Sequence, residues 1–107
     1  MSFSKILLKK IKRKLSAKLP KTHSGLIRRA KSLKISIKKS ESGILDTESL
    51  IEKIRMLKYN KENLQKFVKS FVFQNVSKTM RLRPFKQKIA ITLKITEKIT
   101  NKLLESK

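Results

Sequence analysis

Lysine and arginine are the residues whose number and spacing in this chain could support a specific chemistry, the binding of phosphate groups. They make up 29 of the 107 residues, against seven Asp and Glu, which leaves a formal net charge of +22. Such an excess opposes a compact fold through self-repulsion unless a polyanion neutralises it. Nucleic acid does so with release of its condensed counterions, and an anionic membrane attracts each nearby basic residue by about 1 kcal/mol. The composition therefore indicates a polyanionic partner.

The basic residues form three main clusters. Residues 9–14 carry five cations in six positions, which on a helix would cover more than one face and could contact phosphates on two sides. Residues 28–31 and 81–88 each contain two arginines, which bind phosphate oxygens through paired hydrogen bonds or stack on an unpaired base. The predicted RNA-binding residues are Lys9, Lys10, Lys12, Arg13, Lys14, Lys18, Lys21, Arg28, Arg29, Lys31, Arg81, Arg83, Lys86 and Lys88.

Phe85 lies inside the third cluster and has two interpretations. Its ring could stack on an extruded base. A Phe at the start of an apolar helix stripe is more often part of a core, and we expect the core role here. Arg81 and Arg83, as clamps on a phosphate backbone, are then the functional residues of this cluster.

Catalytic or metal chemistry is not indicated. The one histidine, His23, lies in an expected loop with no acid nearby in sequence to orient it as a base. Most of the acids stand at expected helix starts, where negative charge is favoured for structural reasons. Gly25 and Gly43 are isolated, so no glycine-rich phosphate loop is present, and there is no Cys. We expect no enzymatic activity, no cofactor, no metal site and no small-molecule substrate.

Modules that read bases are also absent. The composition excludes zinc fingers, and neither the aromatic strand motifs of an RRM nor the GXXG loop of a KH domain occurs. A helix-turn-helix over residues 47–81 stays open, although its turn would lack the usual Gly. Binding through phosphate contacts and shape is therefore expected rather than sequence-specific recognition.

Helices are the elements predicted to position these side chains. In the first, Phe3, Leu7, Ile11, Leu15 and Leu19 recur every four residues. Ser2 or Ser4 can cap its start, and Pro20 marks its end. Residues 21–43 are ambiguous, because the apolar positions fit a helix and those at 33–37 also alternate as in a strand, before an expected loop at 40–43.

The second half of the chain contains the predicted core. A helix from residue 47 is followed by a longer one, capped by Asn60, whose apolar side consists of Leu64, Phe67, Val68, Phe71, Val72, Val76 and Met80. Residues 85–105 fit a helix that packs back on 61–81, whereas the β-branched alternation at 89–95 fits a strand. The helix is preferred because the spacing by four continues to Leu103.

The expected fold is mainly α: a helical hairpin at about 47–81, extended by 85–105, with a basic helical arm before it. The alternative is an α+β fold with short strands near 33–37 and 89–95. Residues 1–40 carry 14 bases and no acid, residues 41–62 a net charge of −1 and residues 63–107 a net charge of +9. We therefore divide the chain into an RNA-binding arm, 1–40, and a small helical domain, 41–107.

These observations predict a structural RNA-binding subunit of a large ribonucleoprotein, namely a ribosomal protein. Its partners would be rRNA or another structured RNA and neighbouring proteins of the particle. The basic, amphipathic, acid-free N-terminal segment resembles a mitochondrial targeting segment, so a mitochondrial ribosome is expected, with a cytoplasmic ribosome as the alternative. The other candidate functions are a peripheral membrane protein with a cationic amphipathic helix and a histone-like DNA-binding protein. No apolar run exceeds three residues, and no transmembrane segment is expected.

Overall fold

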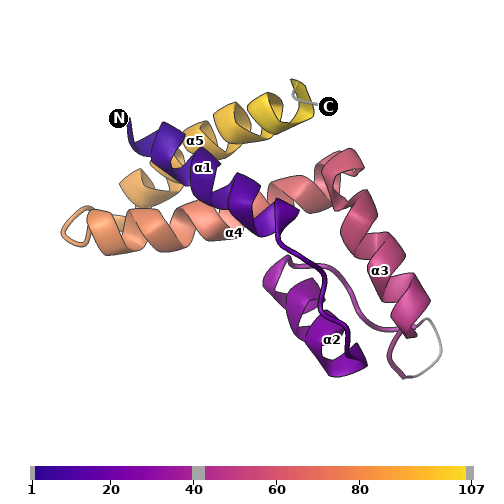
Figure 1. Cartoon of the computed structure of the whole chain (residues 1–107). Coiled ribbons are helices and arrows are strands. Elements are labelled where there is room, and N and C mark those ends of the chain that lie inside the picture. The colour runs from indigo at the N-terminus through magenta and orange to yellow at the C-terminus, as the bar shows by residue number, and fades with distance from the viewer. Residues whose placement is uncertain (1, 40–42, 106–107) are drawn as a thin grey trace.

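A computed structural model describes residues 2–39 and 43–105 of the chain and shows a mainly helical protein (Figure 1). Its elements in these ranges are α1 (Phe3–Ser16), α2 (His23–Ser32), α3 (Thr47–Met56), the 3-10 turn η1 (Leu57–Tyr59), α4 (Lys61–Thr79) and α5 (Phe85–Glu105). The only β-type pairing among the described residues is an isolated bridge between Lys38 and Ile44. The mainly α prediction is confirmed, and the α+β alternative with strands near 33–37 and 89–95 is wrong.

Local capping signals determine where three of the helices begin. The side chains of Ser2, Asp46 and Asn60 accept hydrogen bonds from backbone N–H groups three residues ahead, at 3.4, 2.9 and 3.2 Å. Each bond satisfies a donor that has no partner inside the helix. Hydrogen bonds from the side chain and the backbone of Ser49 lower the pKa of Asp46, because they stabilise its carboxylate.

Helix α5 forms where the sequence also permitted a strand. It lies alongside α4, to which the short segment 80–84 connects it (Figure 1). Ile99 is buried, and Ile91, Ile95 and Leu103 are half-buried against the core. A strand here would have no neighbouring strand to pair with among the described residues, so burial along one helix face outweighs the β-branched preference.

The helices predicted over 47–81 are present, but the most extensive helix packing among the described residues is between α4 and α5. Helix α3 instead packs beside α2, and η1 connects it to α4 with a change of direction (Figure 1). The reason is that α5 covers much of the apolar side of α4. The arrangement brings residues from before position 40 into contact with the second half of the chain.

Residues 21–39 contain α2 and its C-terminal cap. Lys34 has a left-handed backbone, φ 61°, and the Ile35 N–H donates to the Ala30 carbonyl at 2.9 Å, as in a Schellman motif. Leu33 and Ile35, on either side of Lys34, are both buried. The alternating apolar pattern therefore arises from a helix end, not from a strand. The expected loop at 40–42 lies outside the described residues.

Gly25 was expected in a loop together with His23, but both belong to the first turn of α2. The Gly25 N–H donates to the capping Thr22 hydroxyl at 3.1 Å. A Cβ at this position would lie 2.7 Å from Cβ of Pro20, so the residue is Gly because the preceding segment passes too close for a side chain.

One core unites the helices. The predicted apolar side of α4 supplies Leu64, Phe67, Val68, Val72 and Val76, all buried, whereas Phe71 is half-buried. The same cluster includes residues from the other helices and their connections: Leu7, Ile11, Leu26, Ala30, Leu33, Ile35, Leu50, Leu57 and Ile99. The division of the chain at residue 40 stays a prediction about function, because the core draws on both sides of it.

Candidate nucleic-acid interface

Helix α1 presents its cations outward. Leu7 and Ile11 are completely buried, while all five basic residues between positions 9 and 14 are exposed. The apolar stripe thus packs on the core of this chain rather than on a separate protein, and holds the helix against α5 (Figure 1). The cations have no comparable number of acids to pair with, since the whole chain contains seven.

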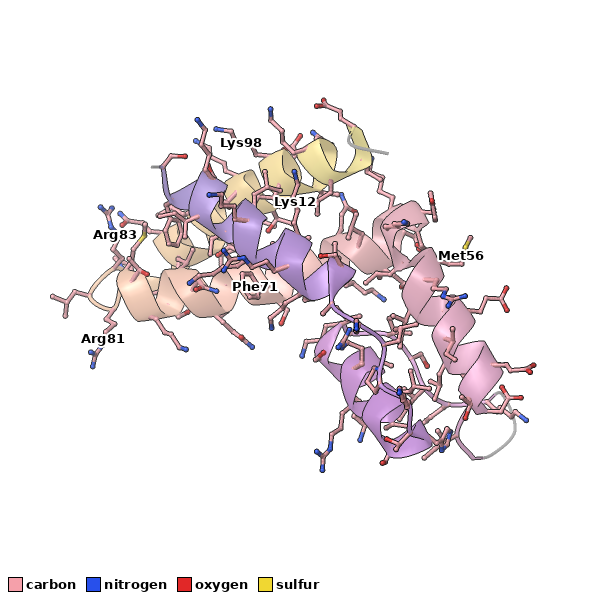
Figure 2. The ribbon with its side chains drawn as sticks, in the orientation of Figure 1. Lys12, Met56, Phe71, Arg81, Arg83 and Lys98 are labelled. Carbon is pink, nitrogen blue, oxygen red and sulfur yellow. The ribbon has the colours of Figure 1, made fainter. Side chains whose placement is uncertain are left out.

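Lys14 has a second role within this cluster. Its ammonium nitrogen lies 5.1 Å from the centroid of the Phe71 ring, a cation–π distance that connects α1 to α4. Figure 2 shows Phe71 on α4, next to the end of α1. Lys9, Lys10, Lys12 and Arg13 are therefore the members of the cluster most clearly available to a partner.

The cluster around α2 divides into surface and structural residues. Lys18, Lys21, Arg28 and Lys31 are exposed. Arg29 is half-buried, and its guanidinium donates to the carbonyl oxygens of residues 17 and 18 at 3.3 and 2.9 Å. It therefore fixes the connection between α1 and α2, a role that its position in a basic pair did not indicate.

The third cluster lies at the turn between α4 and α5, where Figure 2 shows Arg81 and Arg83 extending from the end of the α4–α5 pair. Arg81, Arg83 and Lys86 are exposed. Lys88 is half-buried and donates through its ammonium to the Arg81 carbonyl at 3.4 Å, which stabilises the turn. Arg83 also donates to the side-chain carbonyl of Gln87 at 3.4 Å.

An additional basic row lies on α5 and was not among the predicted residues. Lys94, Lys98 and Lys102 are exposed and spaced by four, so they share one face of the helix. Figure 2 shows Lys98 on α5, beside α1. The sequence shows the spacing of these lysines by four, but their proximity to α1 depends on the packing of α1 on α5.

His23 is a structural residue in the part of the chain that the structure describes. Its Nε2 lies 2.8 Å from the Leu45 carbonyl and must donate, because a carbonyl oxygen only accepts. This bond connects α2 to the segment before α3. Within residues 2–39 and 43–105, no three His, Asp or Glu side chains are close enough together to hold a metal ion.

The predicted residues do not converge on one pocket. They spread over an elongated body with extents of 42 × 29 × 21 Å, from α2 at one end to the α4–α5 turn at the other. Such a distribution suits many separate phosphate contacts rather than one small ligand. None of the described helices combines the length and apolar character needed to cross a membrane.

Comparison of the chain with protein-family models, with curated protein sequences and with solved structures gave no match. The chemistry of its own residues is therefore the basis for a functional proposal.

Proposed function

We propose that this protein is a structural RNA-binding subunit of a large ribonucleoprotein, a ribosomal protein that contacts rRNA through phosphates and shape. The observation that carries the proposal is the arrangement of α1. Leu7 and Ile11 of its apolar stripe are completely buried and Phe3 and Leu15 are half-buried, while its five clustered cations are exposed on a body with a net charge of +22. The fold thus holds a dense row of positive charge rigidly at the surface, ready for a polyanion.

The same observation disfavours the membrane alternative. An interfacial helix binds by inserting its apolar face among lipid chains. In α1 that face includes Leu7 and Ile11, both with no exposed surface, so insertion would require the helix to leave the core. RNA binding requires no such rearrangement.

The remaining parts of the proposal concern location and neighbours. The acid-free basic segment 1–40 favours a mitochondrial ribosome, with a cytoplasmic ribosome as the alternative. Neighbouring proteins are the second class of partner, and the exposed side chain of Met56 offers them apolar contact surface away from the α4–α5 turn (Figure 2).

Sedimentation of a native lysate tests the proposal, with the chain followed by mass spectrometry after RNase, DNase or no treatment. We expect migration with a ribosome-sized particle that RNase abolishes and DNase does not. Loss on DNase treatment would replace the proposal with a histone-like function. Migration with membranes after either nuclease would replace it with the interfacial-helix function.

A further inference from the structure

Phe85 opens α5 but is not part of the core. Its side chain is 67% exposed, so the expectation that it begins a buried stripe is wrong. Its ring instead packs against Phe73 of α4, outside the core cluster. The ring is open to water and lies in the same short stretch of sequence as two exposed arginines, Arg81 and Arg83.

The ring forms one wall of a groove between α4 and α5. Phe85 and Phe73 meet edge to face, with centroids 6.0 Å apart and an interplanar angle of 78°. This arrangement leaves ring faces free, because an edge contact covers at most one face of the pair. The groove has a volume of about 400 Å³, and Lys66, Lys69, Ser70, Ile89 and Thr92 complete its lining.

Positive charge surrounds the two rings. Lys66 and Lys69 border the groove from α4. Arg81, Arg83 and Lys86 lie in the adjoining turn and first helical residues and are all exposed. The complementary ligand is therefore a flat apolar group attached to negative charge.

An unpaired nucleobase has this chemistry, since its π face stacks on an aromatic ring while its phosphates meet the surrounding cations. Bases inside a duplex keep their faces covered by their neighbours, so the ligand is a base in a bulge, loop or single strand. A lipid tail fits less well: the one apolar residue at the tip, Leu82, is fully exposed between two arginines that would enter the bilayer with it.

We propose that the groove between α4 and α5, lined by Phe73 and Phe85, binds one unpaired RNA base, with Lys66, Lys69 and Lys86 on its flanking phosphates. The inference rests on the proposed RNA-binding function and specifies where an unpaired base is bound.

The test compares two hairpin RNAs of equal length, one fully paired and one with a single bulged 2-aminopurine. The full-length protein is used with three variants: Phe85→Leu, which keeps an apolar side chain, Phe85→Tyr, which keeps a ring, and Leu82→Ala as a control at an exposed apolar residue outside the groove. Circular dichroism verifies that each variant retains its helices. A parallel experiment uses vesicles of phosphatidylcholine and phosphatidylserine.

We expect the wild type to prefer the bulged RNA by roughly 5- to 150-fold, the range that loss of one base–aromatic stack produces. Stacking should quench the fluorescence of 2-aminopurine. Phe85→Leu should lose both the preference and the quenching, while Phe85→Tyr and Leu82→Ala retain them.

Three results would overturn the inference. Equal, salt-dependent binding of the two RNAs would reject the base site and leave the proposed function standing. Binding to neither RNA would reject both. Vesicle binding that Phe85→Leu retains and Leu82→Ala weakens, without a preference between the RNAs, would assign the turn to lipid.

Discussion

Helix α1 and the α4–α5 turn are both strongly basic, but they differ in whether their apolar side chains are buried. In α1 the apolar residues Leu7 and Ile11 are completely buried beneath five exposed cations. At the turn, Leu82 and Phe85 are exposed among the cations. The same composition thus yields two surfaces. One uses burial to hold its charges in place, and the other leaves apolar groups available to a ligand.

Element length explains why Leu82 is exposed. Helix α1 has 14 residues and can place a continuous stripe against the body. The segment 80–84 is too short to form a face of its own, and no other described element packs over it. The side chain of Leu82 therefore faces water, whereas Met80 in the same segment is half-buried against the core.

Truncation of one leucine in each region gives the largest expected contrast. We expect Leu7→Ala to lower the free energy of unfolding by about 2–5 kcal/mol, because it removes a core side chain and leaves a cavity. Leu82→Ala should change it by less than about 0.5 kcal/mol, since the side chain makes no buried contact. Denaturant titrations of both variants measure the contrast, and equal losses would contradict it.

Neutralising cations of α1 should affect binding without affecting folding. Replacing Lys9, Lys10 and Arg13 by Gln should weaken binding to structured RNA on the order of 100-fold at moderate salt and lower the salt slope by about 2–3, as three counterion-releasing contacts are lost. Lys14 is kept because of its contact with Phe71. Filter binding across salt concentrations provides the measurement.

The control for this triple variant removes the same charge from another part of the surface. Replacement of Arg55, Lys58 and Lys61 by Gln should lower the slope less, because these residues lie in the near-neutral segment of the chain. An equal decrease in both variants would mean that net charge, and not α1, determines binding.

Helix α5 begins at the turn and continues into the core, so its later residues should respond as core residues do. The hydroxyls of Thr96 and Thr100 are buried and have no hydrogen-bond partner among the described residues, whereas Thr92 donates to the Lys88 carbonyl at 2.7 Å. Thr96→Val and Thr100→Val should each raise the free energy of unfolding by about 1 kcal/mol, because an unsatisfied buried polar group is replaced by a methyl.

Thr92→Val is the matched control for these valine variants and should bring no gain, since it removes a satisfied hydrogen bond. Thermal unfolding of the three variants separates the effects. A loss of stability in Thr96→Val would show that its hydroxyl has a partner in solution.

The smallest expected effect concerns Lys34, which lies outside both α1 and the α4–α5 turn. Lys34 has a φ of 61°, which costs a residue with a Cβ roughly 1 kcal/mol. Lys34→Gly should therefore raise the free energy of unfolding by about 0.5–1 kcal/mol, and Lys34→Ala should not. The same denaturant titrations check this, and equal stabilisation by Ala would attribute the gain to removal of charge.

Much of the fold was readable from the sequence because it depends on neighbours along the chain. The caps at Ser2, Asp46 and Asn60 act within three residues, and the stripe of α4 repeats within one helix. The exposure of the predicted interface residues was also largely predictable. Of the 14 predicted basic residues, 12 are exposed, and only Arg29 and Lys88 are half-buried and bonded to backbone carbonyls.

The sequence by itself determined the helical class and the starts of α1, α3 and α4, and it led to the proposal of a polyanionic partner, because periodicity, capping and charge are local or additive properties. Tertiary structure decided that residues 89–95 join a helix, that α1 packs on its own core, and that Phe85 stays outside it. Each of those outcomes depends on which helix packs over a given face, and such packing joins segments that lie far apart along the chain.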